Sequence, residues 1–253
     1  FCWEEAHRLV GVDAVTEPMP GCPTIHYCMG GIPVNTDGKV RNSNDGFVEG
    51  FFAAGETSCV SVHGANRLGS NSLLECVVYG KRTGAAIAHY VQNRQLPSID
   101  EARYIKEAEQ QIQTLIEQPG QYRINQIRQS FQDNMTEYCG VFRNQELMSQ
   151  GLEKIAELQQ KFSQIYLDDK GTSWNTELVE ALELQSLMVV GQTILTSAIN
   201  RQESRGAHFR EDFSGRDDNK FLKHTMAYYS PTGIDIQYRP VTITMFEPKE
   251  RKY

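Results

Sequence analysis

The chain has 253 residues, enough for one large domain or two domains of ordinary size with a buried core. Its 25 Lys and Arg residues against 32 Asp and Glu residues give a formal net charge of −7. Because this balance provides no broad cationic field, it argues against nucleic acid or anionic lipid as a partner. The 6 cysteines include no C-x-x-C pair, so we predict no metal site and expect reduced, mostly buried thiols.

Residues 1–95 are rich in glycine and proline and mix short strands with turns. Residues 1–11, FCWEEAHRLVG, are typical of the end of an amphipathic helix without an N-cap, so we expect the chain to be part of a longer protein. IPVNTDGKV and GFVEGFFAAGE predict short strands flanking a turn at residues 42–46, followed by a helix from Ser72 to Gln92. This order predicts a strand, turn and helix unit of an α/β sheet, in which ligands collect beyond the strand ends.

Residues 100–205 contain little glycine or proline and show helical periodicity. The linker QLPSID precedes them, with Pro97 blocking the preceding helix. We predict three or four long helices, at about 101–118, 121–142, 144–167 and 175–203. The first of these carries an apolar stripe that predicts packing along its length, made of Ile105, Ala108, Ile112, Leu115 and Ile116.

The most apolar long segment, residues 184–199, is interrupted by polar side chains and falls short of the roughly twenty apolar residues of a membrane span. We therefore predict a buried helix of a soluble protein. Residues 206–253 form a last, β-containing part. Within it, FLKHTMAYYS and DIQYRPVTITMF are rich in β-branched and aromatic residues and predict a small sheet or hairpin.

Two short motifs combine a permissive backbone with a polar group. In HYCMGG, residues 26–31, two glycines allow close passage of a flat ligand, and His26 can donate to an anionic group. In FFAAGE, residues 51–56, Glu56 follows a buried strand end and is placed to accept hydrogen bonds from polyol hydroxyls. Each motif alone also fits a structural histidine or a loop-capping glutamate.

A third motif, HGANRLGSNSLLE at residues 63–75, places a cation beside a helix start. Arg67 has a planar fork of donors that matches a carboxylate. The polar residues just before the helix leave N–H groups and the positive end of the helix dipole facing any ligand, an arrangement that favours negative charge. The alternative interpretation is an ordinary capped helix with a surface arginine.

The three motifs occur in this order within fifty residues, and together they closely resemble the flavoprotein subunit of succinate dehydrogenase and fumarate reductase. The resemblance continues through RQESRGAHFREDF at 201–213, RDDNKFLKHT at 216–225 and the terminal RPV and RKY. It therefore spans essentially the whole chain.

The resemblance implies a fold and a set of binding residues. The fold class is α/β + α: residues 1–95 are the C-terminal segment of an FAD- and substrate-binding α/β domain, 100–205 a helical bundle domain, and 206–253 a small C-terminal β-containing extension. By resemblance the dicarboxylate substrate is bound by His26 and Arg67, and the FAD contacts are Glu56, Ser72 and Leu73.

The resemblance also implies a reaction. Succinate is oxidised to fumarate by loss of a hydride to the flavin and a proton, and electrons pass to an iron-sulfur subunit and through it to a membrane anchor and quinone. Such a protein is peripheral, at the cytoplasmic face of a bacterial inner membrane or the equivalent matrix side. The chain contains no G-x-G-x-x-G motif for the FAD pyrophosphate, and the family's proton-shuttling arginine is expected before Phe1. We assign no catalytic residue and expect these residues alone to be inactive.

Alternatives remain at this point. The charged segment ESRGAHFRED is better explained as a salt-bridged cluster joining the helices to the terminal sheet than as a substrate site. L-Aspartate oxidase has nearly the same H-G-x-N-R-L motif, but tends to have C-G-G where this chain has Met29-Gly30-Gly31. The physiological direction can also be fumarate reduction, and the chain can be a binding or assembly module without activity.

Overall fold

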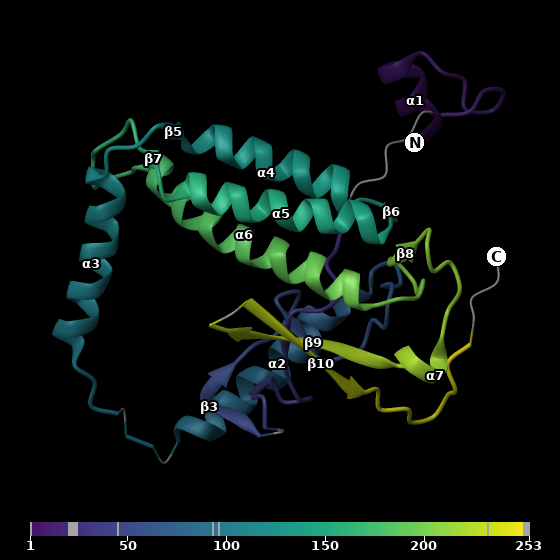
Figure 1. The fold of residues 1–253 in the computed structure, drawn as a ribbon. Coiled ribbons are helices and arrows are strands. Elements are labelled where there is room, and N and C mark those ends of the chain that lie inside the picture. Colours follow the sequence, from purple (N-terminus) through teal and green to yellow (C-terminus); the bar gives the residue numbers. More distant parts are fainter. Residues whose placement is uncertain are drawn as a thin grey trace.

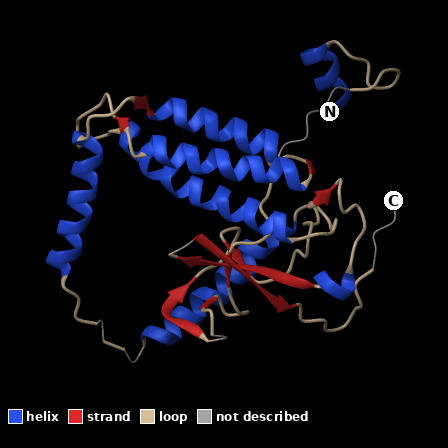
Figure 2. Cartoon of the chain, in the orientation of Figure 1, coloured by secondary structure: helices blue, strands red, loops and turns tan. Residues whose placement is uncertain are grey.

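The computed structural model describes residues 2–19, 25–44, 46–92, 94–95, 97–231 and 233–249 (Figure 1). Helices and strands both contribute, as predicted, and Figure 2 shows the longer strands on one side of a group of long helices, with short strands at the ends of these helices. The helices of the described residues are α1 Cys2–Val10, α2 Asn71–Val91, α3 Glu101–Glu117, α4 Ile124–Tyr138, α5 Gln145–Phe162, α6 Thr176–Asn200 and α7 Asp218–Phe221. The strands are β1 Ile32–Pro33, β2 Lys39–Arg41, β3 Phe47–Phe52, β4 Ser58–Cys59, β5 Tyr122–Arg123, β6 Phe142–Arg143, β7 Ile165–Tyr166, β8 Phe209–Arg210, β9 Lys223–Ser230 and β10 Gly233–Pro240.

Short strand pairs lead into α2. β1 and β4 pair in parallel and β2 and β3 antiparallel. The prediction of one strand at IPVNTDGKV is wrong, because a turn separates β1 from β2. The Asn35 side chain stabilises this turn by accepting hydrogen bonds from the backbone N–H groups of Asp37 and Lys39, at 3.0 and 2.9 Å. The predicted helix is confirmed, and α2 begins one residue earlier than expected, at Asn71.

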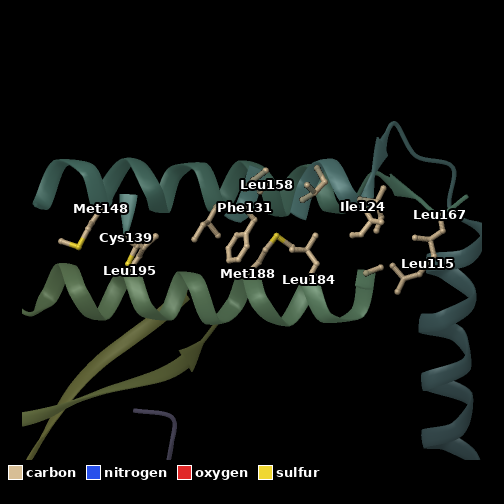
Figure 3. Close-up of a cluster of buried hydrophobic side chains, with 14 of the residues drawn as sticks. Leu115, Ile124, Phe131, Cys139, Met148, Leu158, Leu167, Leu184, Met188 and Leu195 are labelled. Carbon is tan, nitrogen blue, oxygen red and sulfur yellow. The ribbon is translucent and has the colours of Figure 1, made fainter. Parts of the chain in front are cut away.

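Helices α4, α5 and α6 lie side by side and enclose the main hydrophobic core (Figures 1 and 3). All four predicted long helices are present, and the core side chains recur at helical spacing. Figure 3 shows Phe131 of α4 and Met188 of α6 pointing toward one another between the helices. The buried residues at the centre of this core are Ile127, Phe131, Met148, Ile155, Leu158, Leu184, Met188 and Leu195.

The apolar stripe of α3 packs only at its C-terminal end, so the expectation of packing along the whole helix is wrong. Leu115 and Ile116 are buried in the bundle core, whereas Ile105 is 56% exposed and Ile112 is 36% exposed. Figure 1 shows the reason: α3 runs away from the end of the bundle, and it meets β7 and α6 near its C-terminal end. An apolar stripe becomes a core only where a second surface covers it.

Helix α6 contains the apolar segment at residues 184–199. The prediction that this segment falls short of a membrane span is wrong, because by length and composition alone the helix is long enough and apolar enough to cross a membrane. One of its faces instead forms part of the bundle core, as expected of a packed helix. The buried positions on this face are Ala181, Leu184, Met188, Gly191, Leu195 and Ala198.

The predicted C-terminal hairpin is confirmed as β9 and β10, which pair antiparallel from Gly233 with Ser230 to Pro240 with Lys223. The expected continuation of β structure through residues 241–246 is wrong. Met245 is 80% exposed and Phe246 is 83% exposed, and in the described residues no strand lies beside this segment to pair with its backbone. A single extended segment gains no ladder hydrogen bonds, so composition alone does not make it a strand.

The charged segment after α6 forms a buried ion cluster, in agreement with its interpretation as a structural element. Glu203 is fully buried and accepts hydrogen bonds from Arg201 and, at 2.7 and 2.9 Å, from Arg205. Arg210 is also fully buried and donates to both oxygens of Asp212 at 2.7 Å, which lowers the pKa of Asp212 to about 2. Pairing is required here, because an isolated buried charge costs several kcal/mol.

The segment after α6 and strand β9 both contact the loop at residues 60–70, which joins β4 to α2. The Ala207 N–H donates to the Ala65 carbonyl at 3.0 Å, and His224 Nε2 of β9 lies 3.0 Å from Ser61 Oγ. Gly206 has a φ of +59°, and a Cβ there would lie 2.3 Å from the Ala65 carbonyl oxygen. Only glycine permits this approach, so the loop and the segment after α6 pack backbone against backbone.

We predict that Gly206→Ala lowers the melting temperature of the complete protein by several degrees, because the methyl group meets backbone that cannot move aside cheaply. Gly215→Ala is the matched control: it lies in the same segment, and a Cβ there meets nothing within 4 Å. Thermal unfolding of the two variants measures the difference. Equal melting temperatures would contradict the packing described for Gly206.

Candidate active site

The three glycine-containing motifs come together in the structure. The Cys28 N–H, in the first motif, donates to Glu56 Oε1 of the second at 3.0 Å. Tyr27, also in the first motif, donates its hydroxyl to Glu75 Oε2 of the third at 2.6 Å. Gly31 adds a backbone contact, since a Cβ there would lie only 2.5 Å from the Thr57 carbonyl oxygen. Residues 26–31 therefore connect the other two motifs.

A buried carboxylate lies at the centre of this arrangement. The side chains of Glu75 and His63 are 2% and 8% exposed, and His63 Nε2 lies 2.6 Å from Glu75 Oε2, the oxygen that also accepts from Tyr27. Since an ionised carboxylate only accepts hydrogen bonds, His63 and Tyr27 are both donors here. Burial, and next the hydrogen bond to Glu75, raise the pKa of Tyr27, so its hydroxyl stays protonated.

The Arg67 guanidinium lies over the Tyr27 ring, with Cζ 4.8 Å from the ring centroid. Its Nη1 donates to the Leu68 carbonyl at 3.2 Å, and its buried Nε has no hydrogen-bond partner. Among the described residues no carboxylate forms an ion pair with Arg67. The guanidinium therefore keeps donors for a ligand carboxylate, as a binding arginine requires.

His26 is exposed and precedes Tyr27, the residue on which Arg67 lies. Tyr27 thus links the two predicted substrate residues. His26 is its neighbour in the chain, and Arg67 contacts its ring. No hydrogen bond joins His26 directly to Arg67 in the part of the chain that the structure describes.

The start of α2 supplies the other predicted contacts. Ser70 is the N-cap, with a φ of 66° and no side-chain capping hydrogen bond. Ser72 is half-buried in the first turn, and Leu73 is 70% exposed. Glu56 is exposed. An apolar side chain at a positive helix end, with a carboxylate elsewhere in the site, fits the flat ring and polyol chain of FAD.

Three residues of this site are absent from the sequence-based prediction: Tyr27, His63 and Glu75. The burial of Glu75 has no local signal, because its apolar neighbours Leu74 and Cys76 are themselves exposed. A buried carboxylate needs partners. The identity of the partners has no local signal, since Tyr27 lies 48 positions away in the chain.

Comparisons with known proteins show which family the chain resembles. Residues 1–73 match the family described as "FAD binding domain", and residues 128–253 match "Fumarate reductase flavoprotein C-term". The chain is 42% identical to the fumarate reductase flavoprotein subunit of a Serratia species over 100% of its own length and 42% of that relative. It is 39% identical to the succinate dehydrogenase flavoprotein subunit of Rickettsia bellii, over 95% of the chain and 41% of the relative.

A solved structure of E. coli quinol fumarate reductase matches with a TM-score of 0.86 and 38% identity, covering 99% of this chain and 42% of that one. The chain thus spans less than half the length of the relatives it matches. The two family matches, the identities and the shared fold all indicate one group of FAD-dependent oxidoreductases. The chain belongs to the family of succinate dehydrogenase and fumarate reductase flavoprotein subunits.

Proposed function

We propose that the complete protein carrying these residues oxidises succinate to fumarate at FAD and passes the electrons to an iron-sulfur subunit. The activity is assigned to the complete protein because the chain covers 42% of the length of the Serratia relative. Within that protein we propose that residues 1–95 belong to the FAD- and substrate-binding domain, 100–205 to a helical domain and 206–253 to a C-terminal extension.

One observation carries the proposal: the Arg67 guanidinium lies on the Tyr27 ring with a buried, unpartnered Nε and no carboxylate partner among the described residues. A surface arginine of no function would reach solvent or an acidic neighbour. This one is held beside the start of α2 and next to the motif that carries His26. The arrangement suits a small anionic ligand that lies against a second, flat one.

For the substrate, we propose that Arg67 binds one carboxylate of succinate and His26 the other. The planar fork of Arg67 can make two parallel hydrogen bonds to a carboxylate, which fixes its orientation as well as its position. Holding both ends leaves the two central carbons between them in a defined place. Such positioning accelerates a reaction because the reacting geometry is set before the chemical step.

For the cofactor, we propose that Glu56, Ser72 and Leu73 contact FAD. Glu56 uses Oε1 to accept from Cys28 N–H, so its Oε2 is available to hydroxyls of the flavin side chain. Leu73 offers an exposed apolar surface to the ring, and the start of α2 favours the negative charge of the reduced cofactor. FAD, when bound, accepts two electrons from the substrate and releases them one at a time. We assign no described residue the transfer of the proton.

The similarity to multi-subunit complexes supports a proposal for the partners and the location. We propose that the protein is a peripheral subunit, connected through its iron-sulfur partner to a membrane anchor and quinone, at the cytoplasmic face of a bacterial inner membrane or the equivalent matrix side. Support comes from the similarity in fold to quinol fumarate reductase. The relatives include both fumarate reductase and succinate dehydrogenase subunits, so the reverse reaction is the alternative direction.

A substrate assay tests the proposal. The complete, FAD-loaded protein is mixed with succinate or with L-aspartate, and bleaching of flavin absorbance is followed with an artificial electron acceptor present or absent. We expect reduction by succinate and reoxidation by fumarate. Reduction by L-aspartate alone would show that the protein is an aspartate oxidase, and no reduction by either compound would contradict the proposed oxidation of succinate.

A second prediction concerns Arg67. In the complete protein, Arg67→Lys should lower succinate turnover by roughly two to three orders of magnitude with FAD still bound, because lysine lacks the two-pronged donor geometry. Arg82→Lys is the matched control: Arg82 also belongs to the α2 region but pairs with Asp37 on the surface, with its side chain 52% exposed. Near-normal turnover of Arg67→Lys would remove Arg67 from the substrate site.

A further inference from the structure

We infer that Glu75 is a positioning residue for the dicarboxylate, acting through Tyr27 on Arg67. This inference rests on the proposed function, because it assigns Glu75 to the same substrate site. Glu75 itself does not face the ligand, since its side chain is 2% exposed and both of its hydrogen-bond donors are protein groups. Its effect must pass through the groups it holds.

The buried carboxylate of Glu75 has few partners. No arginine or lysine of the described residues forms an ion pair with Glu75, and its partners are His63 and the Tyr27 hydroxyl. Replacing one member of a buried hydrogen-bonded group leaves its partners unsatisfied, so this carboxylate holds both of its partners in place. Its physical consequence is therefore geometric: it fixes two side chains from two other segments.

Two contacts fix the orientation of the Tyr27 ring. Glu75 holds the hydroxyl end at 2.6 Å, and the His63 ring meets the Tyr27 ring edge to face, with centroids 5.2 Å apart and planes at 80°. Both donors bind the same carboxylate oxygen, so the two rings are fixed relative to one another. Tyr27 cannot rotate without breaking a charge-assisted hydrogen bond, which is stronger than a neutral one.

The Tyr27 ring in turn positions the Arg67 guanidinium. Its guanidinium lies 4.8 Å from the Tyr27 ring centroid, so the ring determines where the guanidinium rests. The position of the guanidinium over the ring also limits where its donors can meet a carboxylate. Because His26 precedes Tyr27 in the chain, the same carboxylate also restrains the backbone that carries the second substrate residue.

The test uses the complete FAD-loaded protein and malonate. Malonate is a dicarboxylate with a single central carbon, so it has no two adjacent hydrogen-bearing carbons between which a double bond could form. The variants are Glu75→Gln, Tyr27→Phe and the double variant. Thr83→Val is the matched control, since Thr83 is 5% exposed in α2 and its hydroxyl has no partner. The readouts are the malonate Kd from flavin absorbance, the KM and kcat for succinate, bound FAD and the melting temperature.

We expect Glu75→Gln to raise the malonate Kd and the succinate KM about tenfold, the loss typical of a hydrogen bond to a charged group. The kcat, bound FAD and melting temperature should stay close to those of Thr83→Val. The double variant should bind malonate no more weakly than Glu75→Gln, because Glu75 acts through the Tyr27 hydroxyl. Tyr27→Phe alone should raise the malonate Kd severalfold, which keeps the test decisive if Glu75→Gln folds poorly.

An unchanged malonate Kd in Glu75→Gln or, where that variant folds poorly, in Tyr27→Phe would overturn this inference and leave the proposed function intact. Loss of FAD and melting temperature in parallel with affinity would show a merely structural role and would also overturn it. Failure of the unmodified protein to bind malonate or oxidise succinate would overturn the proposed function together with the inference.

Discussion

A buried carboxylate must find hydrogen-bond donors, and at Glu75 these come from two segments that precede it in the chain. Tyr27 belongs to the motif that carries His26, and His63 is the first residue of the motif that carries Arg67. The tyrosine ring then bears the Arg67 guanidinium. One charge in α2 thus determines how three chain segments meet, and the proposed substrate site depends on that meeting.

The loop at residues 60–70 is also restrained from the C-terminal side. Gly206 and Ala207 pack against the Ala65 carbonyl, and His224 of β9 contacts Ser61. The segment around Gly206 is itself fixed to α6 by the buried ion cluster around Glu203 and Arg210. Residues more than 130 positions beyond Arg67 therefore help to fix the loop that carries it. The contact between Ser61 and His224, for example, joins residues that are 163 positions apart in the chain. The segment after α6 and β9 of the terminal hairpin thus support the loop that carries Arg67.

Local sequence patterns predicted the helices well, because periodicity and stop signals act over a few turns of chain. They failed where a partner surface decides the outcome: the exposed Ile105 in α3 and the unpaired segment at residues 241–246 both have suitable composition but no covering element. The motifs pointed to His26, Glu56 and Arg67, and the structure brings their segments together. Tyr27, His63 and Glu75 could not be paired from the sequence, because their contacts depend on how the chain returns to the start of α2.

The most direct test of the central claim is a crystal structure of the complete protein with FAD and malonate. We expect a malonate carboxylate on the Arg67 guanidinium, with the guanidinium still over the Tyr27 ring and Glu75 still hydrogen-bonded to Tyr27 and His63. Malonate bound away from Arg67, or a guanidinium turned away from Tyr27 to reach it, would contradict the claim that Glu75 sets the geometry of this site.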